Sequence, residues 1–248
     1  MKVISLGSGS KGNATLVEIT GSYVLIDNGF TLKETERRIP VSLSEVSAIL
    51  LTHDHSDHLC GVGETAKKYG IDVHIPDRLI GLRKNYLSGV NSVAHVDGVW
   101  DLDGITVTQF RLPHDATYTV GYKLVKGKES FAIVTDLGGI RQSIVENLLG
   151  VNVAVIESNY DALMLEKGPY PPQLKRRISG GLGHVSNEQA GELAVRLVES
   201  GTKSIVLAHI SENNNVPELA YDTVGKKLAL SKLNARLNFA EQTKVKIF

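Results

Sequence analysis

Apolar and polar positions alternate in short blocks along the chain, and this pattern predicts an α/β fold. Short apolar and β-branched runs bounded by Gly, Asn, Asp or Pro are typical of strands. Longer runs with apolar residues at every third or fourth position are typical of helices. The predicted strands are 2–6, 14–20, 23–27, 48–51, 71–75, 105–112, 119–125, 130–135, 151–156 and 204–208, with short strands near 236–239 and 244–247. The predicted helices are 32–39, 64–69, 76–87, 140–149, 173–179, 186–200 and 216–230.

The segment 52–58 is unusually rich in histidine and aspartate, and it directly follows the apolar run 48–51. A helix is predicted after it, so the segment lies in a loop that leaves the end of a strand. His53 and His55 alternate as on a strand, whereas Asp57 and His58 come after the chain has turned. Imidazole and carboxylate groups are the ligands that Zn²⁺ or Mn²⁺ takes in proteins. We therefore predict a metal site here.

Three more residues of these types stand at predicted strand ends, namely His114, Asp136 and His209. Strand ends gather along one rim of a layered α/β fold, where functional side chains are commonly placed. The expected metal ligands are His53, His55, Asp57, His58, His114, Asp136 and His209. Seven ligands can hold two ions if one carboxylate bridges them, and a hydroxide held between two ions is a nucleophile at neutral pH. His74 and His95 have no such neighbours in sequence and are predicted to be structural or surface histidines.

Two further polar features lie near the N-terminus. The glycine-rich loop 7–13 is either a phosphate-binding nest or a tight connection between strands. Asp27 ends a predicted strand before Asn28-Gly29, so it is either a turn residue or an acceptor that holds a metal-binding histidine in position.

Composition narrows the class of protein. A chain of 248 residues fits one domain, and 42% hydrophobic with 22% charged residues is ordinary for a soluble globular protein. No apolar run reaches the ~18 residues of a membrane span, so no membrane association is expected. The single cysteine, Cys60, excludes an internal disulfide, suits a reducing cytoplasm and is predicted to be a small buried residue. The formal net charge of zero means that nucleic-acid binding would need a local basic patch.

The motif His53-x-His55-x-Asp57-His58 resembles the first metal motif of the metallo-β-lactamase fold superfamily. The resemblance implies a four-layer αββα sandwich, in which two mixed sheets have helices outside, and the hairpin-rich halves near 1–115 and 116–248 agree with this. It implies that His53, His55 and His114 bind one ion, that Asp57, His58 and His209 bind the other, and that Asp136 bridges. It also favours Asp27 as a residue that orients a ligand. Aspartate rather than cysteine at position 136 departs from the antibiotic-hydrolysing members and favours phosphodiesterase-like or lactonase-like relatives.

Several segments resemble the YycJ/WalJ group of this superfamily over essentially the whole chain. They are Ser8-Gly9-Ser10-Lys11-Gly12-Asn13, the segment 52–61, Glu157-Ser158-Asn159 and Gly183-His184-Val185-Ser186-Asn187-Glu188. The resemblance implies a 5′-to-3′ DNA exonuclease associated with mismatch repair. The residues permit that mechanism, because His184 at a predicted helix N-terminus could donate to a phosphate oxygen or protonate the leaving 3′ oxygen, although it could instead be a capping or loop histidine. The predicted catalytic residues are Asp57 and His184, and the predicted substrate contacts are Ser8, Ser10, Asn13, Ser158, Asn159 and His184. The short spacing between Asp136 and His209 leaves no room for the inserted β-CASP-type domain of some relatives, so a single domain over 1–248 is expected.

Alternatives stay open at this point. The chain could be a phosphodiesterase for a small cyclic phosphate, an RNA-processing nuclease or a binding protein without catalysis, although a complete ligand set argues against the last. DNA is favoured over RNA as partner, and a homodimer or mismatch-repair protein partners would compensate for the neutral net charge. Lys175, Arg176 and Arg177 either contact a nucleic-acid strand or form a solvated helix face. The sequence leaves the choice between Zn²⁺ and Mn²⁺ undecided.

Overall fold

The computed structural model describes residues 1–248, with the exception of the side chains of residues 83 and 84. The chain forms two compact units, and each contains its own sheet and hydrophobic core. Unit 1 comprises residues 1–98, 116–120 and 241–248, and unit 2 comprises residues 99–115 and 121–240. The sequence-based division near residue 115 was therefore only approximate. The segment 99–115 belongs with the second unit, whereas the last residues of the chain return to the first.

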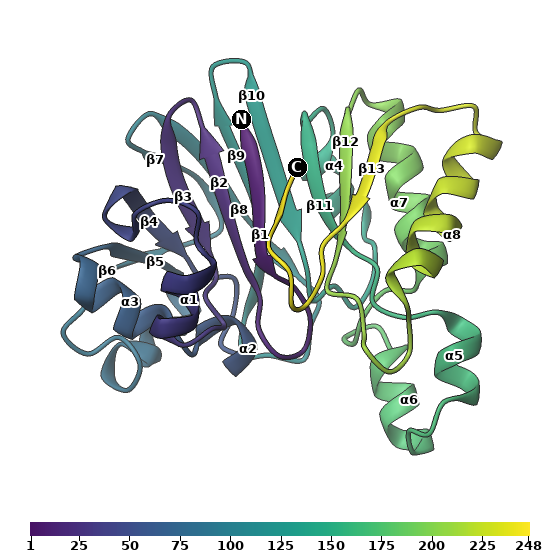
Figure 1. The fold of residues 1–248 in the computed structure, drawn as a ribbon, viewed down its shortest axis with the longest axis horizontal. Helices are drawn as coiled ribbons and strands as arrows, with labels where there is room; N and C mark the ends of the chain where they lie inside the picture. The colour runs from purple at the N-terminus through teal and green to yellow at the C-terminus, as the bar shows by residue number, and fades with distance from the viewer. The chain divides into compact units, whose positions relative to one another are not determined.

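Unit 1 is built on a seven-stranded mixed sheet with the order β14-β1-β2-β3-β4-β5-β6. Its strands are β1 (Lys2–Gly7), β2 (Ala14–Ile19), β3 (Ser22–Ile26), β4 (Val46–Leu50), β5 (Asp72–Pro76), β6 (Ser92–His95) and β14 (Lys246–Ile247). Strands β3 to β6 run parallel, and β14, β1, β2 and β3 pair antiparallel, so the two ends of the chain meet in one sheet (Figure 1). Leu25, Ile49 and Val73 lie in one cross-strand row and are fully buried, which explains why these strands are continuously apolar.

The helical segments of unit 1 are α1 (Leu32–Arg38), α2 (Ser56–Leu59) and α3 (Val62–Tyr69), with 3₁₀ turns at Leu43–Glu45 and Asp77–Lys84. Helix α3 buries Val62, Thr65 and Ala66, which are spaced three and four residues apart on one face. It ends where Gly70 takes the left-handed conformation that favours glycine.

Unit 2 is built on a second seven-stranded mixed sheet, with the order β13-β12-β11-β10-β9-β8-β7. Its strands are β7 (Gly98–Leu102), β8 (Ile105–Leu112), β9 (Thr119–Lys126), β10 (Glu129–Val134), β11 (Val153–Glu157), β12 (Ser204–Ala208) and β13 (Arg236–Phe239). Strands β10 to β13 run parallel, and Val134, Ile156 and Leu207 form a fully buried row across three of them.

The helices of unit 2 are α4 (Gln142–Leu148), α5 (Ala162–Lys167), α6 (Pro172–Ile178), α7 (Asn187–Glu199) and α8 (Pro217–Leu230). Ser186 caps α7 by accepting from the backbone N–H of Gln189, whose side chain accepts from Ser186 in return. Helices α7 and α8 lie side by side, and α5 and α6 form a separate pair (Figure 1). None of the described helices has both the length and the apolar composition that crossing a membrane requires.

Most predicted elements are present, and the differences have local causes. The predicted helix 76–87 is a 3₁₀ segment that contains Gly81, a residue that weakens an α-helix. Helices α2 and α5 and strands β6 and β7 were missed. Asp161 caps the start of α5 by accepting a hydrogen bond from the backbone N–H of Met164. The helix was not predicted because several prolines follow in the sequence and indicated a loop. The prediction of a buried Cys60 was wrong, because its side chain is exposed just after α2.

Two leucines on α8 allow a matched test of the unit 2 core. Leu228 is buried at 4% exposure, whereas Leu230 is 85% exposed. We expect Leu228→Ala to lower the free energy of unfolding by about 2–5 kcal/mol, because it leaves a cavity. Leu230→Ala should change it by less than about 0.5 kcal/mol. Urea unfolding of the two variants measures both values, and equal effects would contradict this description of the core.

Candidate functional site

Three candidate residues occupy a strained backbone conformation one or two residues after the end of a strand. Asp27 follows β3 with φ 58°, Asp136 follows β10 with φ 57°, and His209 follows β12 with φ 53°. Residues other than glycine seldom adopt this left-handed region, and the cost is about 1–3 kcal/mol each. Such strain is concentrated at functional sites.

Asp27 organises the polar segment of unit 1. Its carboxylate accepts from the backbone N–H and the hydroxyl of Thr52, each at 2.7 Å, and lies 2.7 Å from Nδ1 of His58. Asp27 and His58 are both buried. Because the Thr52 hydroxyl donates to Asp27, it can accept from Nδ1 of His53, 3.0 Å away. One carboxylate thus orients one histidine directly and a second through a hydroxyl.

The remaining residues of the motif surround these two. The ring centroid of His53 lies 4.7 Å from that of His55 and 4.2 Å from that of His58. Oδ2 of Asp57 lies 3.6 Å from Nε2 of His58. The amide nitrogen of Asn13 lies 3.0 Å from the same Nε2 and 3.2 Å from Oδ2 of Asp57. The structure therefore brings all four sequence-predicted residues of segment 52–58 together within unit 1.

The glycine-rich loop 7–13 is fastened to this cluster. The backbone N–H of Asn13 donates to the carbonyl of Asp57, and Ser8 donates to the side-chain carbonyl of Asn13. A side chain at Gly29 would place its Cβ 1.7 Å from the carbonyl oxygen of Asp57, so only glycine permits this approach. Ser8 and Asn13 are buried, whereas Ser10 is exposed. A substrate contact from any of these three stays a prediction.

Glu157 plays the corresponding part in unit 2. It ends β11, is fully buried and accepts from the backbone N–H groups of Asp136, Leu137 and Val185. The same carboxylate lies 2.7 Å from Nδ1 of His209 and 2.9 Å from Nδ1 of His184. Burial alone would raise the pKa of Glu157, but the charges and hydrogen bonds of His184 and His209 hold it well below its usual range. Glu157 is therefore an anion that orients two histidines and the backbone beside Asp136.

His114 completes the cluster of unit 2. Its Nδ1 lies 3.1 Å from the carbonyl of Gly183, and its Nε2 lies 3.5 Å from Oδ1 of Asp136. Burial lowers the pKa of His114, which favours the neutral ring that metal binding needs. Asp136, Glu157, His184 and His209 each offer a ligand atom within 4.8 Å of the others.

The donor set of both units fits a divalent ion. His53, His58, His114 and His209 all have an acceptor at Nδ1, namely a hydroxyl, a carboxylate or a carbonyl. In a neutral ring, an Nδ1–H that donates to such a group leaves the lone pair on Nε2, directed away from that group. This is the arrangement of histidines that bind metals in proteins.

His184 differs from the other histidines in its charge. Burial opposes its protonation, but the Glu157 carboxylate, its hydrogen bond to Nδ1, and the charges of Asp136 and Asp115 together raise the pKa of His184 to about 9. The ring lies 5.2 Å from those of His114 and His209, centroid to centroid. At neutral pH it is a cation next to the predicted ligands. This charge suits a proton donor or an anion contact better than a metal ligand.

Ser158 and Asn159 lie in a buried network of polar side chains. The hydroxyl of Ser158 donates to Asn187, and the amide of Asn159 donates to the carbonyl of His209. Asn215 in turn donates to Asn187 and to the backbone carbonyls of Ser158 and Asn159. These contacts hold the strand ends that carry Glu157 and His209. A substrate contact for either residue stays a prediction.

The sequence-based site omitted Glu157. Glu157 ends a buried strand, as Asp136 nearly does, so the strand-end argument would have identified it. His74 is buried, and its Nδ1 lies 2.8 Å from Nε2 of His95 with the two rings stacked. These two histidines form a pair on neighbouring strands β5 and β6, which agrees with the prediction that they are structural or surface histidines.

Comparison with known proteins adds independent information. Residues 22–210 match the family model described as Beta-lactamase superfamily domain. The chain is 35% identical over 246 residues to Exodeoxyribonuclease WalJ of Streptococcus pneumoniae serotype 2, covering 94% of this chain and 90% of that protein. It is 34% identical over 230 residues to Exodeoxyribonuclease YycJ of Bacillus anthracis, covering 90% and 87%. Among solved structures, the metallo-beta-lactamase fold protein YhfI from Bacillus subtilis matches with a TM-score of 0.74 at 18% identity, over 100% and 99% of the two chains, which shows the same fold.

The His184–Glu157 contact predicts a pH dependence of stability in the metal-free protein. Because the pKa of His184 is raised above the ~6.5 of an unfolded histidine, its stabilising effect is complete below about pH 6.5. It is lost as the pH rises through about 9. We expect wild-type protein to lose on the order of 1–3 kcal/mol more than His184→Asn between pH 6 and pH 9.5. Urea unfolding at both pH values measures the difference, and identical losses would show that the contact does not favour the charged ring.

Proposed function

Because this chain belongs to the beta-lactamase superfamily and to its WalJ and YycJ exodeoxyribonuclease group, we propose that it is a metal-dependent 5′-to-3′ exonuclease acting on DNA. The observation that carries the proposal is the match to these relatives over nearly the whole of each chain. The chemistry of the site also supports the proposal, because its histidines and carboxylates can hold divalent ions. A metal-bound water can then act as the nucleophile, so no serine or cysteine nucleophile is needed.

The proposed metal ligands are those that the sequence predicted. His53, His55 and His114 would hold one divalent ion, Asp57, His58 and His209 a second, and Asp136 would bridge. Support comes from the carboxylates Asp27 and Glu157, which direct Nε2 of His58 and His209 away from themselves. Bound divalent ions at such a site lower the pKa of a water and neutralise charge on phosphate oxygens. Zn²⁺ and Mn²⁺ both suit these ligands.

His184 is the proposed proton donor. Its Nδ1 is occupied by Glu157, so Nε2–H is the group that would reach a substrate. With its pKa raised to about 9, the ring is charged at neutral pH and can donate to a phosphate oxygen or protonate the departing 3′ oxygen. Glu157 keeps the ring oriented while the proton leaves.

DNA is the proposed substrate. Four further properties stay predictions: 5′-to-3′ polarity, a link to mismatch repair, a homodimer and a cytoplasmic location. The formal net charge of zero offers no general attraction for nucleic acid. Local contacts must therefore provide the binding. Arg177 and Lys175 are held by Asp115 and by the carbonyl of Glu166, whereas Arg176 is exposed on α6. A substrate contact from these basic residues is part of the proposal.

The test is an activity assay on protein stripped with a chelator and reloaded with Zn²⁺ or Mn²⁺. The substrates are 5′-phosphorylated single-stranded DNA, duplex DNA, a matched RNA and a cyclic nucleotide. We expect stepwise release of mononucleotides from the 5′ end of DNA. Chelator-treated protein and Asp136→Ala should lose about 10³-fold or more of this rate, because they lack the ions or the bridging carboxylate.

One control variant and the pattern of cleaved substrates make the assay decisive. Lys128→Ala alters an exposed turn between β9 and β10 and should retain full activity. Cleavage of the cyclic nucleotide alone would move the protein to the small-phosphodiester class, and preference for RNA would identify a ribonuclease. Absence of cleavage of every substrate by metal-loaded wild-type protein would refute the proposed activity.

A further inference from the structure

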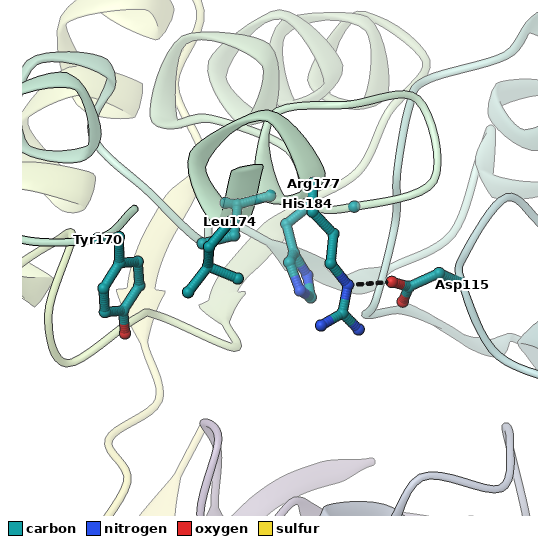
Figure 2. A pocket seen from close by; sticks show the side chains of 7 residues that line it. Asp115, Tyr170, Leu174, Arg177 and His184 are labelled. Carbon is teal, nitrogen blue, oxygen red and sulfur yellow. Dashed lines mark hydrogen bonds and ion pairs between the residues drawn. The ribbon is translucent and has the colours of Figure 1, made fainter. Parts of the chain in front are cut away.

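A cavity of about 180 Å³ opens beside His184 (Figure 2). It lies wholly within unit 2, where α6 and the loop that follows it meet the residue after His114. It is smaller than the ~300–1,000 Å³ of pockets that hold drug-sized ligands, so it has room for about one ring system. Because His184 lines it, a group bound there would lie next to the proposed proton donor.

One wall of the cavity is apolar and aromatic. Tyr170, Leu174 and Ile178 provide it, and all three are only partly buried in the absence of a ligand. The hydroxyl of Tyr170 accepts from the side-chain amide of Asn213 at 2.8 Å, which fixes one end of the side chain. A restrained aromatic ring beside two aliphatic side chains is a surface against which a planar base can stack.

The opposite wall is polar and carries charge. Arg177 donates through Nε to Oδ2 of Asp115. In Figure 2 the contact to Asp115 leaves from Nε, and the two terminal nitrogens lie below that contact at the lower side of the guanidinium. The Arg177 side chain is 63% exposed, so a ligand can reach it. A guanidinium fork fixed at Nε presents its remaining N–H groups in the geometry that suits phosphate oxygens.

The loop between α6 and α7 brings His184 into the lining of the cavity. The backbone N–H of His184 donates to the carbonyl of Ile178, and that of Asp115 donates to the carbonyl of Leu182. A side chain at Gly183 would place its Cβ 2.1 Å from the carbonyl of Ile178, so this tight path requires glycine. The cavity is therefore a fixed part of unit 2 and is attached on both sides to residues of the candidate site.

We propose that this cavity binds a single deoxynucleotide, with its base against Tyr170 and Leu174 and its phosphate at Arg177. The inference rests on the proposed function and adds to it the place where one nucleotide next to the scissile bond is held. Space for only one base explains why a strand would be shortened one nucleotide at a time. Base stacking is largely indifferent to sequence, which suits an exonuclease that must pass every base.

The experiment measures binding without turnover. Wild-type protein in excess chelator is titrated by calorimetry with dAMP, with deoxyadenosine and with inorganic phosphate. Joining base and phosphate in one ligand should make dAMP bind at least about tenfold more tightly than either fragment. Removal of the metal ions ensures that phosphate affinity comes from protein side chains alone.

Variants of single residues distinguish the contribution of the aromatic wall to base binding from that of Arg177 to phosphate binding. Tyr170→Ala should weaken dAMP and deoxyadenosine by about fivefold or more and leave phosphate unchanged. Arg177→Ala should weaken dAMP and phosphate by a similar factor and leave deoxyadenosine unchanged. Lys128→Ala, in the exposed turn between β9 and β10 and outside the lining of the cavity, should alter none of the three affinities.

Two outcomes would contradict nucleotide binding in this cavity without contradicting the proposed exonuclease activity. One is dAMP binding to wild-type protein no more tightly than phosphate, a comparison that needs no variant to fold. Another is unchanged dAMP affinity in Tyr170→Ala. Conversely, nucleotide binding with the predicted variant pattern in a protein that degrades no DNA would refute the exonuclease proposal and retain the pocket.

Discussion

A buried carboxylate at a strand end holds the candidate ligands of each unit in place. Asp27 in unit 1 and Glu157 in unit 2 each accept from histidine Nδ1 and from backbone N–H groups of neighbouring strand ends. An isolated buried charge is costly, so each carboxylate is stable only because its oxygens are surrounded by donors. The same hydrogen bonds fix which nitrogen of His58 and of His209 faces outward. Ligand orientation and local folding therefore depend on one interaction in each unit.

This arrangement of buried carboxylates and histidines requires unfavourable backbone conformations, which the rest of each unit must stabilise. Asp27, Asp136 and His209 adopt left-handed backbone conformations, and Gly29 allows backbone contact that a Cβ would block. The rows of fully buried apolar residues in the two parallel sheet segments, such as Leu25–Ile49–Val73 and Val134–Ile156–Leu207, supply the rigidity that keeps such conformations populated. Strain and polar burial at the strand ends are thus supported by apolar packing along the strands.

Strand positions and candidate ligands could be read from the sequence because both depend on local patterns. Strands 105–112, 204–208 and 236–239 were predicted to the residue, and every predicted ligand lies beyond a strand or in the motif. The position of Glu157 at a strand end could be read from the sequence, but its role as an orienting group could not, because its partners His184 and His209 are distant in sequence. Cys60 was misjudged because exposure depends on how α2 turns, and the return of residues 241–248 to unit 1 depends on pairing with β1. Contacts across long sequence separations leave no local signal, and the cavity at Tyr170 and Arg177 is of this kind.

The central claim is that Asp27 and Glu157 prepare the histidines of both units for divalent ions. The direct measurement is the metal affinity of chelator-stripped protein, titrated with Zn²⁺ or Mn²⁺ and analysed by elemental content after desalting. We expect wild-type protein to retain two ions per chain, and Asp27→Asn and Glu157→Gln each to bind them about 10–100-fold more weakly, since orienting partners contribute that much to metal affinity. Wild-type affinity in both folded variants would contradict the account.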